Sequence, residues 1–229
     1  MNTIIKNGIE YSIRHTLPCW EQTRGGYGSE YWEVYSPKLG RDVKLYSNVE
    51  WEHWLLLESD PNVVYFCEQP VRMLTLVGEK GSSFIDMWVL FADHTEEYRE
   101  IKVSEDVDSD RSKKQIQIQK SWCERNNFVH RVVTELDLKK FKQQIESCKE
   151  FIGFIPHKIS ERHLKLQRSV TDIVVSHGQI KFIELVEKFV GSSEQQVLST
   201  IFTLIHSGVL HAPLDIQRYS KNMLVSIRR

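Results

Sequence analysis

Two stretches of strand-forming residues lie close together near the middle of the chain. Residues 84–91 read Phe-Ile-Asp-Met-Trp-Val-Leu-Phe, and residues 97–103 read Glu-Tyr-Arg-Glu-Ile-Lys-Val. The residues between them, 92–95, predict a turn, so the two strands are expected to pair. A helix is predicted over about 111–126, with another strand over 128–133. Because strand, strand, helix and strand follow one another, the sequence predicts a mixed α/β core.

The composition is that of an ordinary soluble globular protein. The chain has 229 residues, of which 41% are hydrophobic and 27% charged, enough for one large domain or two small ones. Its formal net charge is −1, so no basic field covers the whole surface, and any surface for DNA must be local. No apolar run approaches the roughly 20 residues that span a bilayer.

The cysteines are scattered. Cys19, Cys67, Cys123 and Cys148 form no CxxC pair, and no histidine stands at zinc-ligand spacing to them. A structural zinc site is therefore not expected. Free thiols without a signal peptide favour a reducing cytosol.

Acidic and basic side chains lie in the two central strands, with Asp86 in the first and Glu100 and Lys102 near the end of the second. Side chains in a strand alternate between its faces, so Glu100 and Lys102 are predicted to share one face. If the strands pair across the turn, Asp86 joins them. Two carboxylates would then hold a hard divalent cation through oxygen ligands, with the Ile101 carbonyl as an extra oxygen and an ammonium beside the attacking water. This arrangement is typical of a nuclease, although an acid-x-Lys run at a strand end also arises by chance on many surfaces.

A further acid lies at the start of a predicted helix over about 48–59, which Asp60-Pro61 ends. Ser47 is a good N-cap, and Glu50 follows it at the spacing of a capping box. Glu50 therefore has two interpretations, a residue that caps its own helix and a third carboxylate of the metal site. One side chain cannot fully serve both roles at once.

Other candidates keep two interpretations each. Glu68 and Gln69 end a strand predicted over 63–70, where they either line the cleft or hold a turn. The remaining candidates either contact DNA phosphates or form solvated surface: Lys113, Lys114, Gln115 and Gln119 in the predicted helix, and Arg24 in a glycine-rich loop over 24–28.

The composition changes near residues 153–156. A helix over 136–152 precedes this point, and the segments beyond it predict three helices, over 161–176, 180–190 and 193–206, and two strands, over 209–212 and 223–227. Three helices and a β-hairpin predict a winged helix. We therefore expect an endonuclease domain over 1–152 and a winged-helix domain over 153–229, whose basic edge carries Lys221, Arg228 and Arg229.

The chain from Tyr46 to Glu135 resembles the catalytic domain of TnsA, the endonuclease subunit of a heteromeric bacterial cut-and-paste transposase. The resemblance lies in the order and spacing of short runs: 47–50 (Ser-Asn-Val-Glu), 57–63 (Leu-Glu-Ser-Asp-Pro-Asn-Val), 68–70 (Glu-Gln-Pro), 84–86 (Phe-Ile-Asp), 100–102 (Glu-Ile-Lys), 122–124 (Trp-Cys-Glu) and 133–135 (Val-Thr-Glu). It implies a restriction-endonuclease-like PD-(D/E)xK fold. It also implies a catalytic set of Glu50, Asp86, Glu100 and Lys102, and favours Glu50 as a metal ligand over a simple cap. Some members of the family carry Gln where this chain has Glu100.

The resemblance also implies partners and a cofactor. Glu50, Asp86 and Glu100 would bind Mg²⁺, with one or two ions and substitution by Mn²⁺ left open. The substrate would be DNA at the ends of a mobile element, cut at the 5′ ends beside a DDE transposase and under the control of an AAA+ ATPase that contacts the C-terminal domain. Protein docking is favoured over DNA binding for the winged helix. The expected location is the bacterial cytoplasm, at the nucleoid when active.

Two other functions stay open. A stand-alone restriction or repair nuclease with the same core would cut DNA without partners. A catalytically inert winged-helix adaptor would use the nuclease-like domain as a scaffold, but decay of this kind usually loses Asp86, Glu100 or Lys102, and all three are present.

Overall fold

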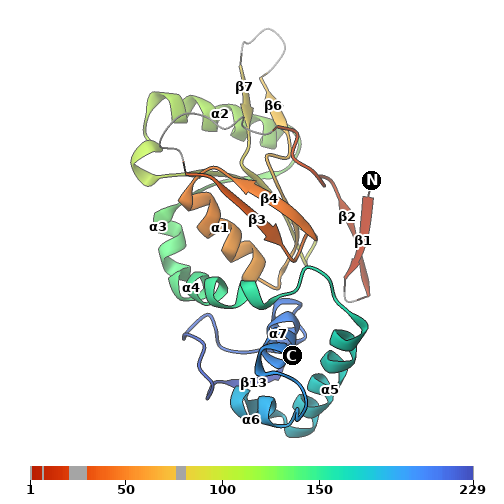
Figure 1. Ribbon diagram of the computed structural model, residues 1–229. Coiled ribbons are helices and arrows are strands. Elements are labelled where there is room, and N and C mark those ends of the chain that lie inside the picture. The colour runs from red at the N-terminus through yellow and green to blue at the C-terminus, as the bar shows by residue number, and fades with distance from the viewer. Residues whose placement is uncertain (1, 7, 21–29, 76–80, 229) are drawn as a thin grey trace. The chain divides into compact units, whose positions relative to one another are not determined.

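The computed structural model describes residues 2–6, 8–20, 30–75 and 81–228. The chain divides into two compact units (Figure 1). The first comprises residues 1–57 and 62–140, and the second comprises residues 58–61 and 141–229. The unit boundary near residue 140 lies before the domain boundary expected after residue 152. Arg24 and the glycine-rich loop over 24–28 lie outside the described residues.

A mixed sheet of four strands forms the centre of the first unit, as the order of predicted elements indicates. Its strand order is β10-β9-β8-β5. β5 pairs with β8 and β8 with β9 in antiparallel fashion, whereas β9 and β10 are parallel. The strands are β5 (Val63–Glu68), β8 (Met87–Phe91), β9 (Glu96–Lys102) and β10 (Val129–Thr134). A parallel pair needs a crossover, which the helix α2 (Asp110–Arg125) supplies.

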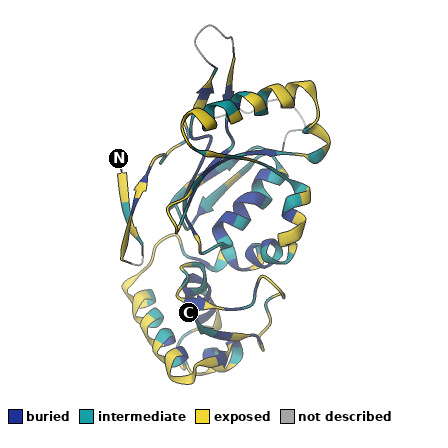
Figure 2. Ribbon diagram, turned by 180° about the vertical axis from the view of Figure 1, so that it is seen from behind, coloured by how far each residue is buried: buried dark blue, intermediate teal, exposed yellow. Residues whose placement is uncertain are grey.

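Two helices contact β9 through alternate residues. Arg99 Nη1 lies 3.0 Å from His53 Nε2 on α1 (Asn48–Ser59), whereas the next residue, Glu100, contacts α2. Trp88 and Tyr98 are fully buried on the α2 side, in an apolar cluster with Cys123 of α2. Figure 2 shows α1 largely buried and α2 exposed along its outer face. The sheet core therefore fixes the strand ends that carry the predicted site.

Three β-hairpins surround this sheet. They are β1–β2 (Asn2–Lys6 and Ile9–Ile13), β3–β4 (Trp32–Ser36 and Arg41–Leu45) and β6–β7 (Arg72–Leu74 and Ser82–Phe84). Tyr11 and Ile13 of β2 join the cluster around Trp88, so the first hairpin contributes to the core. The β6–β7 hairpin lies beside α2 (Figure 1). Arg125 Nη2 of α2 donates to the Leu74 carbonyl at 2.9 Å.

The structure corrects the prediction of a single strand over 84–91. Phe84 ends β7, where it pairs with Arg72, and β8 begins only at Met87. Asp86 therefore lies in the short link between two strands of different sheets. The cause lies in the tertiary structure. The backbone nitrogen of Gln69 donates to the Asp86 carbonyl (2.9 Å), and this contact holds the link between the two strands.

The prediction of one helix over 136–152 is also wrong. The segment contains α3 (Glu135–Leu138), a 3₁₀ turn over Lys139–Phe141, α4 (Lys142–Phe151) and a second 3₁₀ turn over Ile152–Phe154. Phe141 has φ −110° and ψ 16°, outside the α-helical region, so the helix cannot continue through it.

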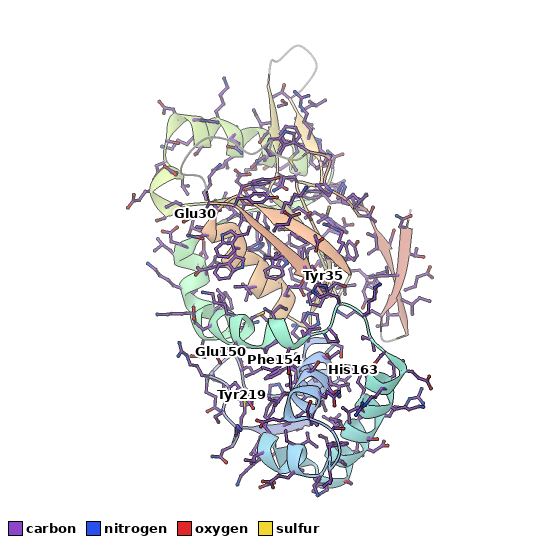
Figure 3. All side chains as sticks on the ribbon, in the orientation of Figure 1. Glu30, Tyr35, Glu150, Phe154, His163 and Tyr219 are labelled. Carbon is purple, nitrogen blue, oxygen red and sulfur yellow. The ribbon has the colours of Figure 1, made fainter. Side chains whose placement is uncertain are left out.

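The second unit contains helices and a small antiparallel sheet. After α4 come α5 (Glu161–His177), β11 (Gln179–Lys181), α6 (Phe182–Glu187), α7 (Glu194–His206), β12 (Leu210–His211) and β13 (Leu224–Ile227). The strand order is β11-β13-β12. The predicted helix over 180–190 begins with a strand, because Ile180 pairs with Val225 far along the chain. Phe202 of α7 packs against Phe154 and Tyr219, with both ring centroids 5.3 Å away (Figure 3).

Among the described residues, no helix is long and apolar enough to span a membrane.

Candidate active site

Asp86, Glu100 and Lys102 meet at the end of the β8–β9 pair. Asp86 Oδ2 accepts a hydrogen bond from the backbone nitrogen of Ile101 at 2.7 Å. Lys102 Nζ lies 2.8 Å from Glu100 Oε1. Glu100 is fully buried, whereas the Lys102 side chain keeps 23% of its exposure. The strand pairing predicted from the sequence thus brings an acid, a second acid and an ammonium together.

Glu50 lies at the start of α1, where its carboxylate contacts the helix end. Its Oε2 accepts from the Tyr46 amide (3.1 Å) and its Oε1 accepts from the Ser47 hydroxyl (3.4 Å). In return the backbone nitrogen of Glu50 donates to Ser47 Oγ (3.1 Å), so Ser47 and Glu50 cap the first turn of α1 through reciprocal contacts. Glu30, labelled in Figure 3, accepts from the backbone nitrogen of Asn48 (2.8 Å) at the same helix end. The capping contacts are present, and a role of Glu50 as a metal ligand stays a prediction.

Negative charge exceeds positive charge at this site, and the acids respond to it. Burial raises the pKa of Asp86 well above its ordinary value, and the Glu100 and Glu50 carboxylates raise it further. Burial raises the pKa of Glu50 to about 7, against the effect of the Tyr46 amide, and Glu100 adds to the rise. Burial lowers the pKa of Lys102, but Glu100 and Asp86 outweigh burial and raise it overall. A second positive charge would relieve this excess.

The donor set fits a magnesium ion. Mg²⁺ prefers oxygen ligands, keeps several waters, and is usually bound through only one or two carboxylates. Asp86 and Glu100 supply two, and the pKa of Asp86 is raised first by burial and then by the neighbouring Glu100 and Glu50 carboxylates, whose negative charge a cation would offset. In the part of the chain that the structure describes, no three His, Cys, Asp or Glu side chains already converge as a complete metal cage. Asp86 and Glu100 are therefore the pair that would hold the ion, with Glu50 turned toward its helix cap.

Glu68 and Gln69 support the site rather than line it with free polar groups. Arg41 on β4 donates to both oxygens of Glu68, at 2.6 Å each, in a bidentate ion pair. Glu68 keeps only 2% of its exposure. Gln69 has a φ of 36°, which is rare for a residue with a side chain, and its backbone nitrogen donates to the Asp86 carbonyl. The strained residue thus holds the link that carries Asp86.

A second carboxylate anchors the chain beyond Lys102. Glu135, the first residue of α3, accepts from the Ser104 amide at 2.8 Å and from the Ser104 hydroxyl. These bonds lower the pKa of Glu135. They tie the segment that follows β9 to the end of β10, which gives a physical role to the run at 133–135.

Sequence reasoning missed the partners of Glu100 on α2. Gln115 and Gln119 were predicted as phosphate contacts or as solvated surface, but both amides donate to the Glu100 carboxylate. Lys113 forms a solvent-exposed ion pair with Asp108 (3.3 Å). The spacing of the two glutamines, one helical turn apart, was the available signal, because it places them on one face of α2.

The family model described as "TnsA-like endonuclease N terminal" matches residues 60–135. The matched segment contains Asp86, Glu100 and Lys102 together with α2, while Glu50 precedes it. A comparison with curated proteins gave no match.

Proposed function

We propose, from the premise that residues 60–135 form a TnsA-like endonuclease domain, that this chain is the metal-dependent DNA nuclease subunit of a cut-and-paste transposase. One observation carries the proposal. Within the matched segment, Asp86, Glu100 and Lys102 come together at the end of two paired strands. Two acids can hold the divalent ion that activates water and polarises a phosphodiester, and an ammonium can offset the charge that develops on the phosphate.

The residues have distinct roles in this proposal. Asp86 and Glu100 hold the ion, Mg²⁺ or in its place Mn²⁺, and Glu50 adds a carboxylate beside them. When bound, the ion supplies Lewis-acid polarisation of the phosphoryl oxygen and a more acidic water. Lys102 orients the attacking water and offsets negative charge that develops on the phosphate, because its ammonium is a compact charge on a flexible stem. The ion pair of Lys102 with Glu100 supports this placement.

DNA is held by local positive charge in this proposal. Arg111, Lys113 and Lys114 stand at the start of α2, the helix that follows β9 along the chain, and all three are exposed. Arg111 is close enough to Lys102 to oppose its protonation. Phosphate contacts of this kind position a duplex without reading its sequence. Choice of the transposon end would then lie mostly with a DDE transposase, which cuts and joins the 3′ ends while this chain cuts the 5′ ends.

The C-terminal region, residues 153–229, is proposed as a winged-helix domain that docks the AAA+ regulator, beside an endonuclease domain over 1–152. The order of α5, β11, α6, α7, β12 and β13, with its three-stranded sheet, supports this architecture. Deletion of residues 161–229 should abolish binding of the ATPase in a pull-down experiment. Full binding by the truncated chain, with a melting transition retained, would contradict the docking role.

In the cell the proposed substrate is chromosomal DNA in the bacterial cytoplasm. The decisive experiment is cleavage of transposon-end DNA in a reaction reconstituted with Mg²⁺, with or without the transposase and the ATPase. We expect 5′-end cleavage that requires the partners and disappears with EDTA. Cleavage by the chain alone would favour the stand-alone restriction or repair nuclease. Absence of cleavage under every condition, with partner binding intact, would favour the inert adaptor.

A further inference from the structure

Two glutamines of α2 contact the buried carboxylate of Glu100. Gln115 Nε2 lies 2.7 Å from Glu100 Oε1, and Gln119 Nε2 lies 2.6 Å from Glu100 Oε2. Both Gln119 and Glu100 are fully buried. Each oxygen of the carboxylate therefore accepts from a different amide of the same helix face.

Gln119 has a fixed orientation. Its Nε2 also lies 2.9 Å from Ser83 Oγ and 3.1 Å from the Phe84 carbonyl, while its Oε1 lies 3.1 Å from His130 Nε2. Rotation of the amide by half a turn would set its oxygen against the Phe84 carbonyl and the Glu100 carboxylate, which are acceptors only. His130 then donates to the amide oxygen and keeps the nitrogen toward Glu100.

Gln115 connects the acid to the ammonium. Its Oε1 accepts from Lys102 Nζ at 3.1 Å, while its Nε2 donates to the Glu100 oxygen that Lys102 also contacts. Glu100 Oε1 thus meets two donors, and Glu100 Oε2 meets Gln119. Since each carboxylate oxygen can accept about two bonds, Oε2 keeps room for one further partner.

The two glutamine donors are neutral, unlike Lys102, and this matters for the chemistry. An arginine in place of Gln119 would hold Glu100 as firmly, but it would cancel the negative charge that attracts a cation. An amide supplies direction and leaves that charge in place. Residues that orient a metal ligand in this way tune its affinity although they do not touch the ion.

We propose that Gln119 and Gln115 are positioning residues of the nuclease site, which hold the Glu100 carboxylate so that Oε2 faces the cation and Lys102 stays beside it. The proposal rests on the proposed function, because it gives these two amides a purpose only if Glu100 binds a metal ion. The alternative is that the glutamines merely satisfy a buried carboxylate and stabilise the packing of α2 on β9.

Binding of Mn²⁺ to the full chain, followed by calorimetry, separates the two roles. Gln119→Leu removes the donor at similar size, and Gln119→Glu keeps the shape but sets a carboxylate against Glu100. Gln117→Leu is the matched control, since Gln117 lies on the same helix but is exposed and contacts Ser121 instead. We expect the Mn²⁺ affinity to fall about 10- to 100-fold for both Gln119 variants and to stay unchanged for the control.

A thermal melt of each variant completes the test. A purely structural role would lower the melting temperature of Gln119→Leu and leave its Mn²⁺ affinity unchanged, which would overturn the inference. Should Gln119→Leu fail to fold, Gln115→Leu serves in its place, because Gln115 is only partly buried and also contacts Glu100. We expect the same loss of affinity from it.

Asp86→Asn tells a failure of this inference from a failure of the proposed function. If the wild-type chain binds Mn²⁺ and Asp86→Asn does not, the metal site stands, and unchanged affinity in the Gln119 and Gln115 variants would overturn only the positioning role. If the wild-type chain does not bind Mn²⁺, or Asp86→Asn binds it as well, the proposed metal site fails and the inference fails with it.

Discussion

Asp86 Oδ2 accepts a 2.7 Å hydrogen bond from the backbone nitrogen of Ile101, the middle residue of the Glu100–Lys102 run. The donor belongs to the backbone, so among substitutions at position 101 only proline, which has no backbone N–H, removes it. Asp86 lies outside the strands, and this bond fixes one of its carboxylate oxygens against β9, the strand that carries Glu100. It explains how the site forms although Asp86 has no regular ladder of its own.

Asp86→Asn should abolish DNA cleavage and leave the fold intact. Asparagine can still accept the bond from Ile101, but it carries no charge for a cation. We expect the cleavage rate to fall by about a thousandfold, since several kcal/mol of transition-state stabilisation would be lost. The rate of 5′-end cleavage in the reconstituted reaction measures this. Asp42→Asn, an exposed aspartate on β4, is the matched control, and equal activity of the two variants would refute the assignment of Asp86.

Ser47→Ala and Glu50→Ala separate capping from catalysis. Each removes one partner of the reciprocal contacts between Ser47 and Glu50 at the start of α1, so each should lower the free energy of unfolding by about 1 kcal/mol. Only Glu50→Ala should also lose cleavage, because it removes a carboxylate beside Glu100 and Asp86. Urea unfolding and end cleavage, measured on both variants, test this. Should Glu50→Ala cleave as fast as Ser47→Ala, Glu50 is a cap alone.

The metal-free chain should lose stability as the pH rises toward neutral, through Glu50. Burial raises the folded-state pKa of this acid from its ordinary value of 4.5 to about 7. The folded state therefore binds the proton more tightly than the unfolded state, and this contribution is complete below pH 4.5 and is lost as the pH rises through about 7.

The difference between wild type and Glu50→Gln isolates this effect, because the glutamine oxygen can still accept from the Tyr46 backbone nitrogen and the Ser47 hydroxyl but the side chain cannot ionise. Urea unfolding in EDTA at several pH values should show wild type losing stability relative to Glu50→Gln between these limits. A difference that does not change with pH would mean that Glu50 ionises in the folded state as it does in the unfolded one.

The Arg41–Glu68 ion pair should stabilise the first unit. The pair is bidentate, and Glu68 is almost fully buried, so removal of either partner strands a charge. We expect Glu68→Leu or Arg41→Met to lower the free energy of unfolding by about 3 kcal/mol, near the lower end for buried pairs because Arg41 keeps some exposure. The double variant should recover most of this loss in urea unfolding. Additive losses would show that the two side chains stabilise the fold independently.

Local sequence signals predicted the elements that local interactions determine. The helix α1 was predicted at its observed ends, because Ser47 caps it and Asp60-Pro61 stops it. The β8–β9 pairing followed from two runs of strand-forming residues around a short turn. The same pattern placed Glu100 and Lys102 on one face, where they form an ion pair.

Predictions failed where pairing with residues distant in the sequence determines the local structure. Asp86 was predicted inside a strand, but Phe84 pairs with Arg72 in a separate hairpin. The first turn of the helix predicted over 180–190 is a strand, because Val225 offers Ile180 a ladder that no local pattern reveals.

Residue types and the period of a strand are properties of a short segment, so the amino-acid sequence was enough to predict Glu100 and Lys102 as neighbours on one face of a strand. Only the tertiary structure decided how these residues are held. The spacing of Gln115 and Gln119 predicts that they share a face of one helix, but it does not identify the group that accepts their hydrogen bonds. That acceptor, Glu100, lies on β9 and meets the two glutamines only because α2 connects β9 with the parallel strand β10. Contacts between elements depend on the packing of the whole core around Trp88 and Tyr98, and packing is not encoded at any one position.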